Sequence, residues 1–374
     1  MRQMASLACA ALLLALAPAA AARDYQAATF LPPSHLLTAG PLIEWSKDIS
    51  AATNGRLRFN VHAGGALLGP TTMMAGLGED VAQIGFVAAS YYPKDFPKTN
   101  TIDDLSFIHT EPLSLAFAFT EFVMATPEIR KEWEDNNLVF IAGMSTPPYQ
   151  LFCRSEMRTA ADLRGKKVRT PNAVLTRWAQ AVGVIPINAP FSEIYIGLER
   201  GALDCAAADN TTLTSARLLE VTRHVMELDL GSYFLGSPWS LSRSFWKELS
   251  AEDRQILLDV TARSLVRLQL TYARSLQSSV DQAKAAGVTF TAASDELEAA
   301  RTAFIAADMG GSAELSKTQL GVKDPARHRD RLTALVEKWK TLLQTTDRSD
   351  ENALLALLRA EIYDSVDVRT YGLK

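Results

Sequence analysis

The chain contains 374 residues, of which 48% are hydrophobic and 21% are charged, and its formal net charge is −4 at pH 7. A weakly acidic chain of ordinary globular composition lacks the basic surface that binds nucleic acids or anionic membranes. The length is sufficient for two domains of common size.

The first segment has the pattern of a secretory signal peptide. Arg2 precedes an apolar run from Leu7 to Leu16, and small residues follow up to Ala22. A basic start, a short apolar run and an A-x-A cleavage site define such a signal. The apolar run is too short to cross a bilayer, and no later segment of the sequence is long enough. We therefore expect a signal peptide over 1–22 and an exported protein in the periplasm.

The segment after the signal alternates between predicted strands and predicted helices. Short alternating or continuously apolar runs predict strands, and longer runs with apolar residues at helical spacing predict helices. Such alternation is typical of α/β proteins. The expected strands are 25–31, 56–62, 81–87 and 138–144, and the expected helices are 35–53, 113–122 and 128–135.

Three polar side chains, Ser90, Tyr91 and Tyr92, follow the strand expected at 81–87. Binding residues often lie in loops that leave a strand end. The three residues are therefore candidates for the wall of a cleft, and a packed loop is an equally good interpretation.

A short run at 166–169, Lys-Lys-Val-Arg, predicts a strand that is followed at once by a helix over 173–182. Thr170 is a candidate cap for this helix, and Pro171 suits its first position because no N–H is needed there. Arg169 is then expected at the carboxyl end of a strand, beside the positive end of a helix, where small anions are often held. The alternative is an arginine that merely ends a strand in solvent.

Two cysteines, Cys153 and Cys205, follow the expected signal peptide. The exported compartment permits a disulfide, but both residues lie in apolar runs that predict strands. Because adjacent strands rarely offer disulfide geometry, two buried free thiols are the favoured interpretation. The Cys and His spacings match no metal site.

The C-terminal third is expected to be helical. Helical spacing runs from 250 to 286 after a capping-box-like start at Ser250. A helix of this length would be roughly 54 Å long and suits an element that lies across two domains, and two helices broken near 275–279 are the alternative. The last predicted helix, from Asn352 to Asp364, is strongly apolar, so it packs on the body or makes a homodimer with another subunit.

Three short segments occur in register: DLRGKKVR at 162–169, PFSEIY at 190–195 and GALD at 201–204. They resemble the substrate-binding proteins of TRAP transporters, the DctP-like family. The resemblance implies a periplasmic binding protein fold of the α/β class, with two domains around a cleft and a long helix that spans both. It also implies that Arg169 binds the carboxylate of the substrate.

Two positions depart from the family pattern. Some members have a second substrate-binding arginine where this chain has Tyr149, and the family often has a Glu-Asn-Pro-like run where this chain has Ala-Ala-Ala-Asp-Asn at 206–210. A single cation leaves a second buried carboxylate poorly compensated. We therefore expect a small organic monocarboxylate, and neither a dicarboxylate nor sialic acid. Alternative sources of a second cation are Arg154, Arg177 and Arg243.

The predicted binding site combines this anchor with aromatic walls and with polar groups that receive a hydroxyl or amino group. No catalytic residue and no cofactor is expected, and a cation that bridges Asp209 to the carboxylate is an open alternative. The candidates are Arg169, Tyr149, Phe191, Asp209, Asn210, Asn172, Ser90, Tyr91, Tyr92, Trp239 and His35. The expected domains are 23–146 with about 238–274, and 147–237 with about 275–300, followed by a helical tail over 301–374.

The sequence thus predicts a receptor that delivers a small organic acid to TRAP permease subunits and performs no chemistry of its own. A rival hypothesis is an exported α/β enzyme that acts on a carboxylic acid. The lack of a nucleophile–base or metal constellation near Arg169 counts against it. A third hypothesis is a receptor that feeds a membrane sensor.

Overall fold

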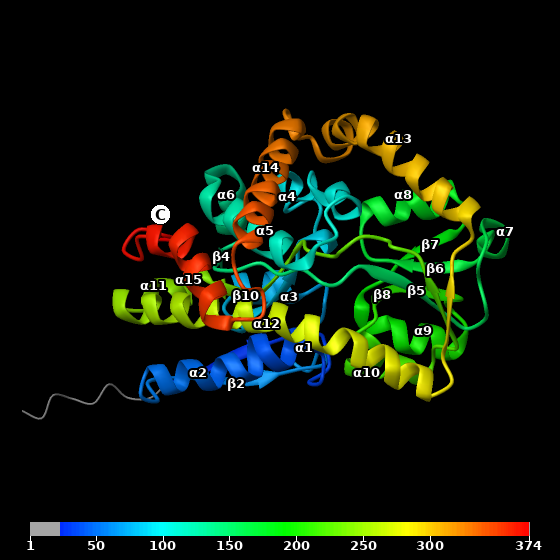
Figure 1. The fold of residues 1–374 in the computed structure, drawn as a ribbon. Helices are drawn as coiled ribbons and strands as arrows, with labels where there is room; N and C mark the ends of the chain where they lie inside the picture. Colours follow the sequence, from blue (N-terminus) through cyan, green and yellow to red (C-terminus); the bar gives the residue numbers. More distant parts are fainter. Residues whose placement is uncertain (1–22, 374) are drawn as a thin grey trace, which may run out of the picture.

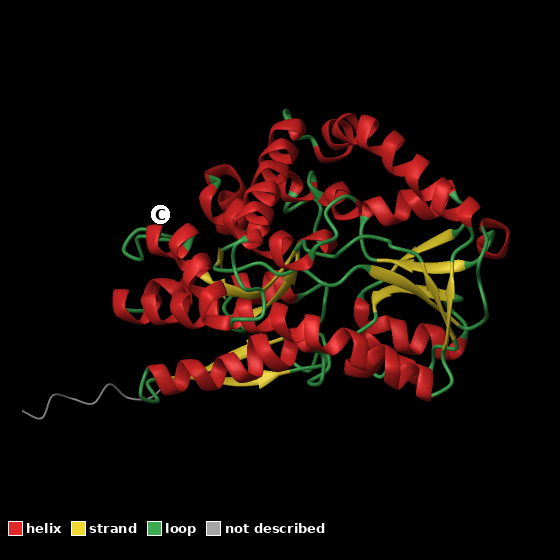
Figure 2. Ribbon diagram, viewed as in Figure 1, coloured by secondary structure: helices red, strands yellow, loops and turns green. Residues whose placement is uncertain are grey.

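The computed structural model describes residues 23–373 and is a mixed α/β protein built on two separate sheets (Figures 1 and 2). We refer to the half built on the first sheet as lobe I and to the half built on the second sheet as lobe II. This arrangement confirms the expected α/β class. The expected signal peptide at 1–22 lies outside the described residues. Within 23–373, no helix is both long enough and apolar enough to cross a membrane.

The sheet of lobe I has five strands in the order β2-β1-β3-β10-β4. β1 is parallel to β2 and β3, and β10 is antiparallel to β3 and β4. Pro238 lies in β10 at a register shift between Ser237 and Ser240, because proline cannot donate to a sheet ladder. The strands are β1 Arg23–Ala28, β2 Leu57–His62, β3 Ile84–Ala88, β4 Leu138–Phe140 and β10 Gly236–Ser242.

The sheet of lobe II has six strands in the order β11-β9-β5-β8-β6-β7. β6 is parallel to β7 and β8, and β5 is antiparallel to β8 and β9. Pro186 lies in β7, an edge strand, where a missing N–H group costs least. The strands are β5 Tyr149–Cys153, β6 Lys167–Thr170, β7 Ile185–Asn188, β8 Cys205–Asp209, β9 His224–Glu227 and β11 Thr289–Ala292.

Two helices differ from the sequence prediction. The helix expected at 35–53 is divided into α1 (Leu36–Thr38), a π-helical segment η1 (Ala39–Glu44) and α2 (Trp45–Ala52), because Pro41 lacks the N–H of a regular helix. The helix after Arg169 is α8, which begins at Ala173 as expected, but its cap lies two residues later than the expected cap at Thr170. Its cap is Asn172, which has an extended backbone and accepts from Leu175 N at 3.3 Å.

Further helical segments complete the fold. They are α3 Met73–Gly78, η2 Ala89–Tyr91, α4 Pro97–Asn100, η3 Asp103–Phe107, α5 Pro112–Ala125, α6 Pro127–Asp135, α7 Ala160–Leu163, α8 Ala173–Ala181, η4 Phe191–Glu193, α9 Ile194–Arg200, α10 Thr212–Ser215, η5 Leu218–Glu220, α11 Arg243–Glu248 and η6 Tyr363–Ser365.

A single 35-residue helix, α12 (Ala251–Ala285), lies along both lobes (Figure 1). Ser250 caps its start by accepting from Asp253 N at 3.0 Å. Near lobe I, Trp45 Nε1 donates to Thr261 Oγ1 at 2.8 Å. Near lobe II, the hydroxyls of Thr214 and Ser279 are 2.7 Å apart. The helix is therefore continuous through 275–279 and ties the two lobes together.

Three helices form the C-terminal part: α13 (Asp295–Leu320), α14 (Pro325–Gln344) and α15 (Glu351–Glu361). Leu354, Leu355 and Leu358 of α15 are buried, Leu357 is half-buried, and α15 packs on α12. Most of the apolar surface that suggested a homodimer is therefore covered within one chain.

Cys153 and Cys205 form a disulfide, so the expectation of two free thiols is wrong. The two residues face each other directly in the β5–β8 pair, with Cα atoms 4.1 Å apart. Opposed residues of antiparallel strands alternate between a wide and a narrow separation, and the narrow pairs bring their side chains close together. The sequence patterns did not show that these two strands are neighbours in this register.

Candidate functional site

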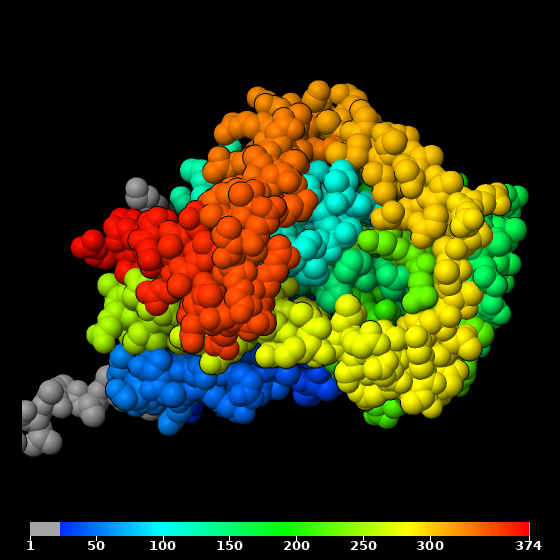
Figure 3. All heavy atoms as spheres, in the orientation of Figure 1, coloured from blue at the N-terminus to red at the C-terminus, as the bar shows by residue number. Residues whose placement is uncertain are grey.

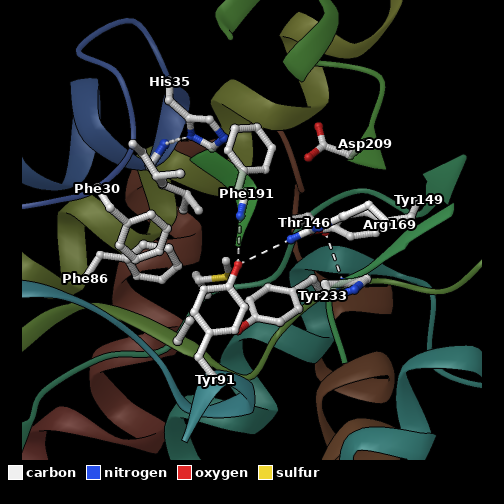
Figure 4. Close-up of a pocket in the computed structure, with 15 residues that line it drawn as sticks. Phe30, His35, Phe86, Tyr91, Thr146, Tyr149, Arg169, Phe191, Asp209 and Tyr233 are labelled. Carbon is white, nitrogen blue, oxygen red and sulfur yellow. Dashed lines mark hydrogen bonds between the residues drawn. The ribbon is translucent and has the colours of Figure 1, made fainter. Parts of the chain in front are cut away.

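A buried cavity lies between the two lobes, and Figure 4 shows its walls. The cavity is small, with a volume of about 30 Å³. Such a narrow space favours a small ligand. The residues that line it are Phe30, Leu31, His35, Leu37, Phe86, Ala88, Tyr91, Met144, Thr146, Tyr149, Arg169, Pro171, Phe191, Asp209 and Tyr233.

Arg169 is the last residue but one of β6 and lies in this cavity with only 1% of its surface exposed. Its Nε donates to Ala189 O at 2.9 Å, and its Nη1 donates to Ala207 O at 2.9 Å. None of the ion pairs among residues 23–373 involves this guanidinium, and its bonds to Ala189, Ala207 and Tyr91 use three of its five N–H groups. A buried cation is costly unless an anion compensates it.

Tyr91 of lobe I contacts the guanidinium of Arg169. Its hydroxyl accepts from Arg169 Nη2 at 3.3 Å and from Phe191 N at 3.1 Å, and both donors belong to lobe II (Figure 4). The hydroxyl proton has no acceptor within the described residues. The cavity therefore offers the free N–H groups of Arg169 and one O–H to an anionic ligand.

Asp209 ends β8 and faces Tyr149 across the β5–β8 pair. Thr211 donates to its carboxylate from the backbone N at 3.1 Å and also from the hydroxyl. Burial raises the pKa of Asp209 to about 6, although the bonds from Thr211 oppose the shift. The carboxylate is therefore mostly charged at neutral pH. It can accept a hydrogen bond from a ligand and repels an anionic group.

Aromatic rings form much of the remaining wall. The rings of Phe30 and Phe86 stack at 5.2 Å, and Phe191 packs edge-on against His35 at 4.9 Å between centroids. Burial lowers the pKa of His35 to about 3, so the ring is neutral. Its Nδ1 accepts from Leu37 N at 3.1 Å, which places the ring proton on Nε2. His35 therefore supplies no positive charge to the cavity.

The structure brings six of the predicted binding residues to the cavity and places the other five outside its lining. The six are His35, Tyr91, Tyr149, Arg169, Phe191 and Asp209. Of the other five, Ser90 Oγ pairs with Tyr233 OH at 3.0 Å, Tyr92 OH donates to Pro70 O, and Asn172 caps α8. The buried Oδ1 of Asn210 has no partner among residues 23–373, and Trp239 is fully buried in β10.

None of the three alternative arginines lines the cavity. Arg177 pairs with Asp104 and Asp308. Arg243 Nη1 donates to Glu134 O at 3.2 Å. Arg154 borders a separate surface hollow. Within residues 23–373, no cluster of three or more metal-binding side chains occurs.

The sequence analysis missed several lining residues, chiefly Phe30, Phe86, Thr146 and Tyr233. Thr146 and Tyr233 lie on the two chain crossings between the lobes, and Thr146 N donates to Tyr233 O at 2.9 Å. Their position at the predicted crossings was the available signal. Phe30 and Phe86 carry no signal, because apolar residues next to strands are usually core residues.

Residues 27–307 match the family described as bacterial extracellular solute-binding protein, family 7, or DctP. A marine metagenome TRAP solute binding protein, crystallised with metahydroxyphenylacetate and described as specific for aromatic acid ligands, has a similar fold. The two structures superpose with a TM-score of 0.75 and share 21% sequence identity. The superposition covers 84% of this chain and 99% of the metagenome protein. This likeness shows the fold alone.

Sequence relatives agree with this class. A solute-binding protein of Albidiferax ferrireducens is 18% identical over 58% of this chain and 64% of its own length. A monocarboxylate 2-oxoacid-binding periplasmic protein of Nostoc is 26% identical over 43% of this chain and 44% of its own length. The chain thus spans less than two thirds of either relative. These descriptions name binding proteins and not enzymes.

Proposed function

This chain belongs to family 7 of the bacterial extracellular solute-binding proteins, and from that premise we propose that it is the periplasmic receptor of a TRAP transporter. It binds a small organic monocarboxylate through Arg169 and delivers it to membrane permease subunits. The observation that carries this proposal is a buried guanidinium without an anionic partner among residues 23–373, inside a cavity between two lobes.

A carboxylate fits the free groups of this site. Two parallel N–H bonds from a guanidinium match the two oxygens of one carboxylate. The hydroxyl of Tyr91 adds a further donor, because its oxygen accepts from Arg169 and Phe191 and its proton is left for the ligand. Closure of the lobes removes the water that would screen these bonds. The site therefore selects an anion with oxygen acceptors.

The remaining wall favours one carboxylate over two. No second arginine or lysine lines the cavity within residues 23–373, and Asp209 is an anion itself. A second carboxylate would lie buried without a cation and close to a like charge. Aromatic rings line the rest, so the body of the ligand is apolar or a ring, and a hydroxyl or amino group on it donates to Asp209. One relative is described as specific for aromatic acid ligands and another as binding monocarboxylate 2-oxoacids, and both descriptions are consistent with this ligand class.

Thermal unfolding with a panel of organic acids tests this proposal. We expect stabilisation by ring-bearing or 2-oxo monocarboxylates, about 2.7 kcal/mol at a concentration 100 times Kd. The matched control is the amide of each active acid, which keeps the body and loses the charge, and it should not stabilise. Stabilisation by C4-dicarboxylates alone would contradict the assignment.

Tyr91→Phe should weaken binding of the active acid roughly 10- to 100-fold, because hydrogen bonds to a charged group contribute about 1.5–3 kcal/mol. Calorimetry measures this change. Tyr92→Phe is the matched control, since Tyr92 OH donates to Pro70 O outside the cavity and should leave affinity unchanged. Equal affinity of wild type and Tyr91→Phe would exclude Tyr91 as a ligand contact.

The partners of the receptor follow from the same proposal. Delivery requires permease subunits, and export follows from the expected signal peptide. A homodimer through the C-terminal helix remains a prediction. The burial of Leu354 and Leu358 within one chain removes most of the apolar surface that motivated it.

A further inference from the structure

The C-terminal extension reaches across both lobes. The family match ends at residue 307, so the segment 308–373 lies outside it. In Figure 3 this part of the chain, orange to red, covers the top and one side of the molecule. The extension begins within α13, whose start lies inside the matched region and is fixed to lobe II, where Ser294 N donates to Arg158 O at 2.8 Å. α14 rests on lobe I, with Trp339 against Phe117 at 5.1 Å between ring centroids.

Four charged side chains join this extension to both lobes. Arg177, on α8 of lobe II, makes two 2.7 Å bonds to the carboxylate of Asp308 on α13. The same guanidinium pairs with Asp104 of lobe I. Asp104 also binds Arg329 of α14 at 3.3 Å. Two cations and two anions thus form a neutral network, and their side chains are between 7% and 23% exposed.

A neighbouring contact also spans the lobes at this place. Asp103 of lobe I accepts from Asn172 Nδ2 at 2.7 Å and from Val174 N at 3.1 Å, at the start of α8. α8 directly follows the strand that carries Arg169. Contacts at this end of α8 therefore exist only while lobe I and lobe II are together around the cavity.

Two glycines lie within the continuous helix α13, beside the network. Gly310 and Gly311 lie between Asp308 and Ser312, and a Cβ atom at either glycine would meet nothing within 4 Å. Neither has a positive φ, so neither packing nor backbone conformation requires glycine. Glycine is the least helix-favouring residue after proline, and glycine pairs are common points of helix bending.

We propose that the extension is a strap that holds the lobes together over the bound solute. The network of Arg177, Asp104, Asp308 and Arg329 fastens it, and α13 bends at Gly310–Gly311 when the lobes separate. The strap goes beyond the proposed function. It depends on that function only in assuming that a solute occupies the closed cavity. The strap lowers the dissociation rate of the solute, because release requires the network to break.

Asp308→Asn tests the fastening, since it keeps the side-chain size and removes the charge. In small-angle scattering without ligand, we expect a larger radius of gyration than in wild type. With the active acid from the panel, we expect dissociation roughly tenfold faster in stopped flow, as for the loss of one charge-assisted contact. Glu314→Gln is the control, because its exposed pair with Lys317 lies within α13. Wild-type values for Asp308→Asn in both measurements would overturn the proposal.

A second variant tests the bend without weakening the fold. Gly310→Ala with Gly311→Ala should raise the thermal midpoint, since alanine favours helix. It should also slow solute association, because a stiffer strap opens less often. If the variant is more stable but associates with the solute at the wild-type rate, α13 does not bend at Gly310–Gly311. The scattering measurement contains no ligand, so it tests the strap even if the ligand assignment is wrong.

Discussion

Arg169→Ala is expected to weaken binding of the monocarboxylate by about 2–5 kcal/mol, the cost of removing one partner from a buried, hydrogen-bonded charge pair. The loss is large because the cavity excludes water and because no other cation lines it within residues 23–373. Arg169→Lys should recover little of the affinity, since a point charge does not replace the fork of a guanidinium. Calorimetry with the active acid measures both variants.

The fold must survive for this experiment to be informative. Arg169 also donates to Ala189 O and Ala207 O, so its removal leaves two buried carbonyl groups without these bonds. Circular dichroism and a thermal midpoint therefore accompany the binding data. Arg154→Ala is the matched control, because this arginine is exposed on the same lobe and lies outside the cavity. A folded Arg169→Ala protein with wild-type affinity would refute the anchor.

Local patterns predicted much of the fold. The alternation of residues 56–62 and the apolar run at 81–87 correspond to β2 and β3, and the long periodic run after Ser250 corresponds to α12. These elements could be predicted because their signals lie within one segment: hydrophobic period, caps and turn residues. The cap at Asn172 was missed by two residues, since Thr170 and Asn172 are both good caps and only the backbone decides between them.

Long-range pairing explains what the sequence did not show. The pairing of β5 with β8 brings Cys153 beside Cys205 and places Tyr149 opposite Asp209. No local sequence pattern predicts this pairing. Trp239 was expected in the cleft because it is aromatic, but β10 buries it completely. The lobe I residues Phe30 and Phe86 reach the cavity only through the arrangement of the two lobes. Tertiary packing decided each of these positions.

Loss of the Cys153–Cys205 disulfide is expected to lower the free energy of unfolding by about 4 kcal/mol, from the entropy of a closed loop of about 50 residues. The two residues are 52 positions apart in the sequence. Urea unfolding of wild type and of the double variant Cys153→Ala, Cys205→Ala measures the difference. A reducing agent should shift the midpoint of wild type to that of the double variant and should not affect the variant. Two free thiols in unreduced, denatured protein from residue 23 onward would contradict the disulfide.

Solute affinity should change far less than stability in that double variant. The disulfide joins one end of the β5–β8 pair, and Tyr149 and Asp209 face the cavity from the other end. Five residue pairs hold this register, from Tyr149 opposite Asp209 to Cys153 opposite Cys205. Because a slip by one residue would turn every side chain to the other face of the sheet, the buried faces keep the register without the sulfur bond. Calorimetry on the folded double variant should therefore give an affinity close to that of wild type, and a loss as large as that of Arg169→Ala would show that the disulfide itself sets the geometry of the site.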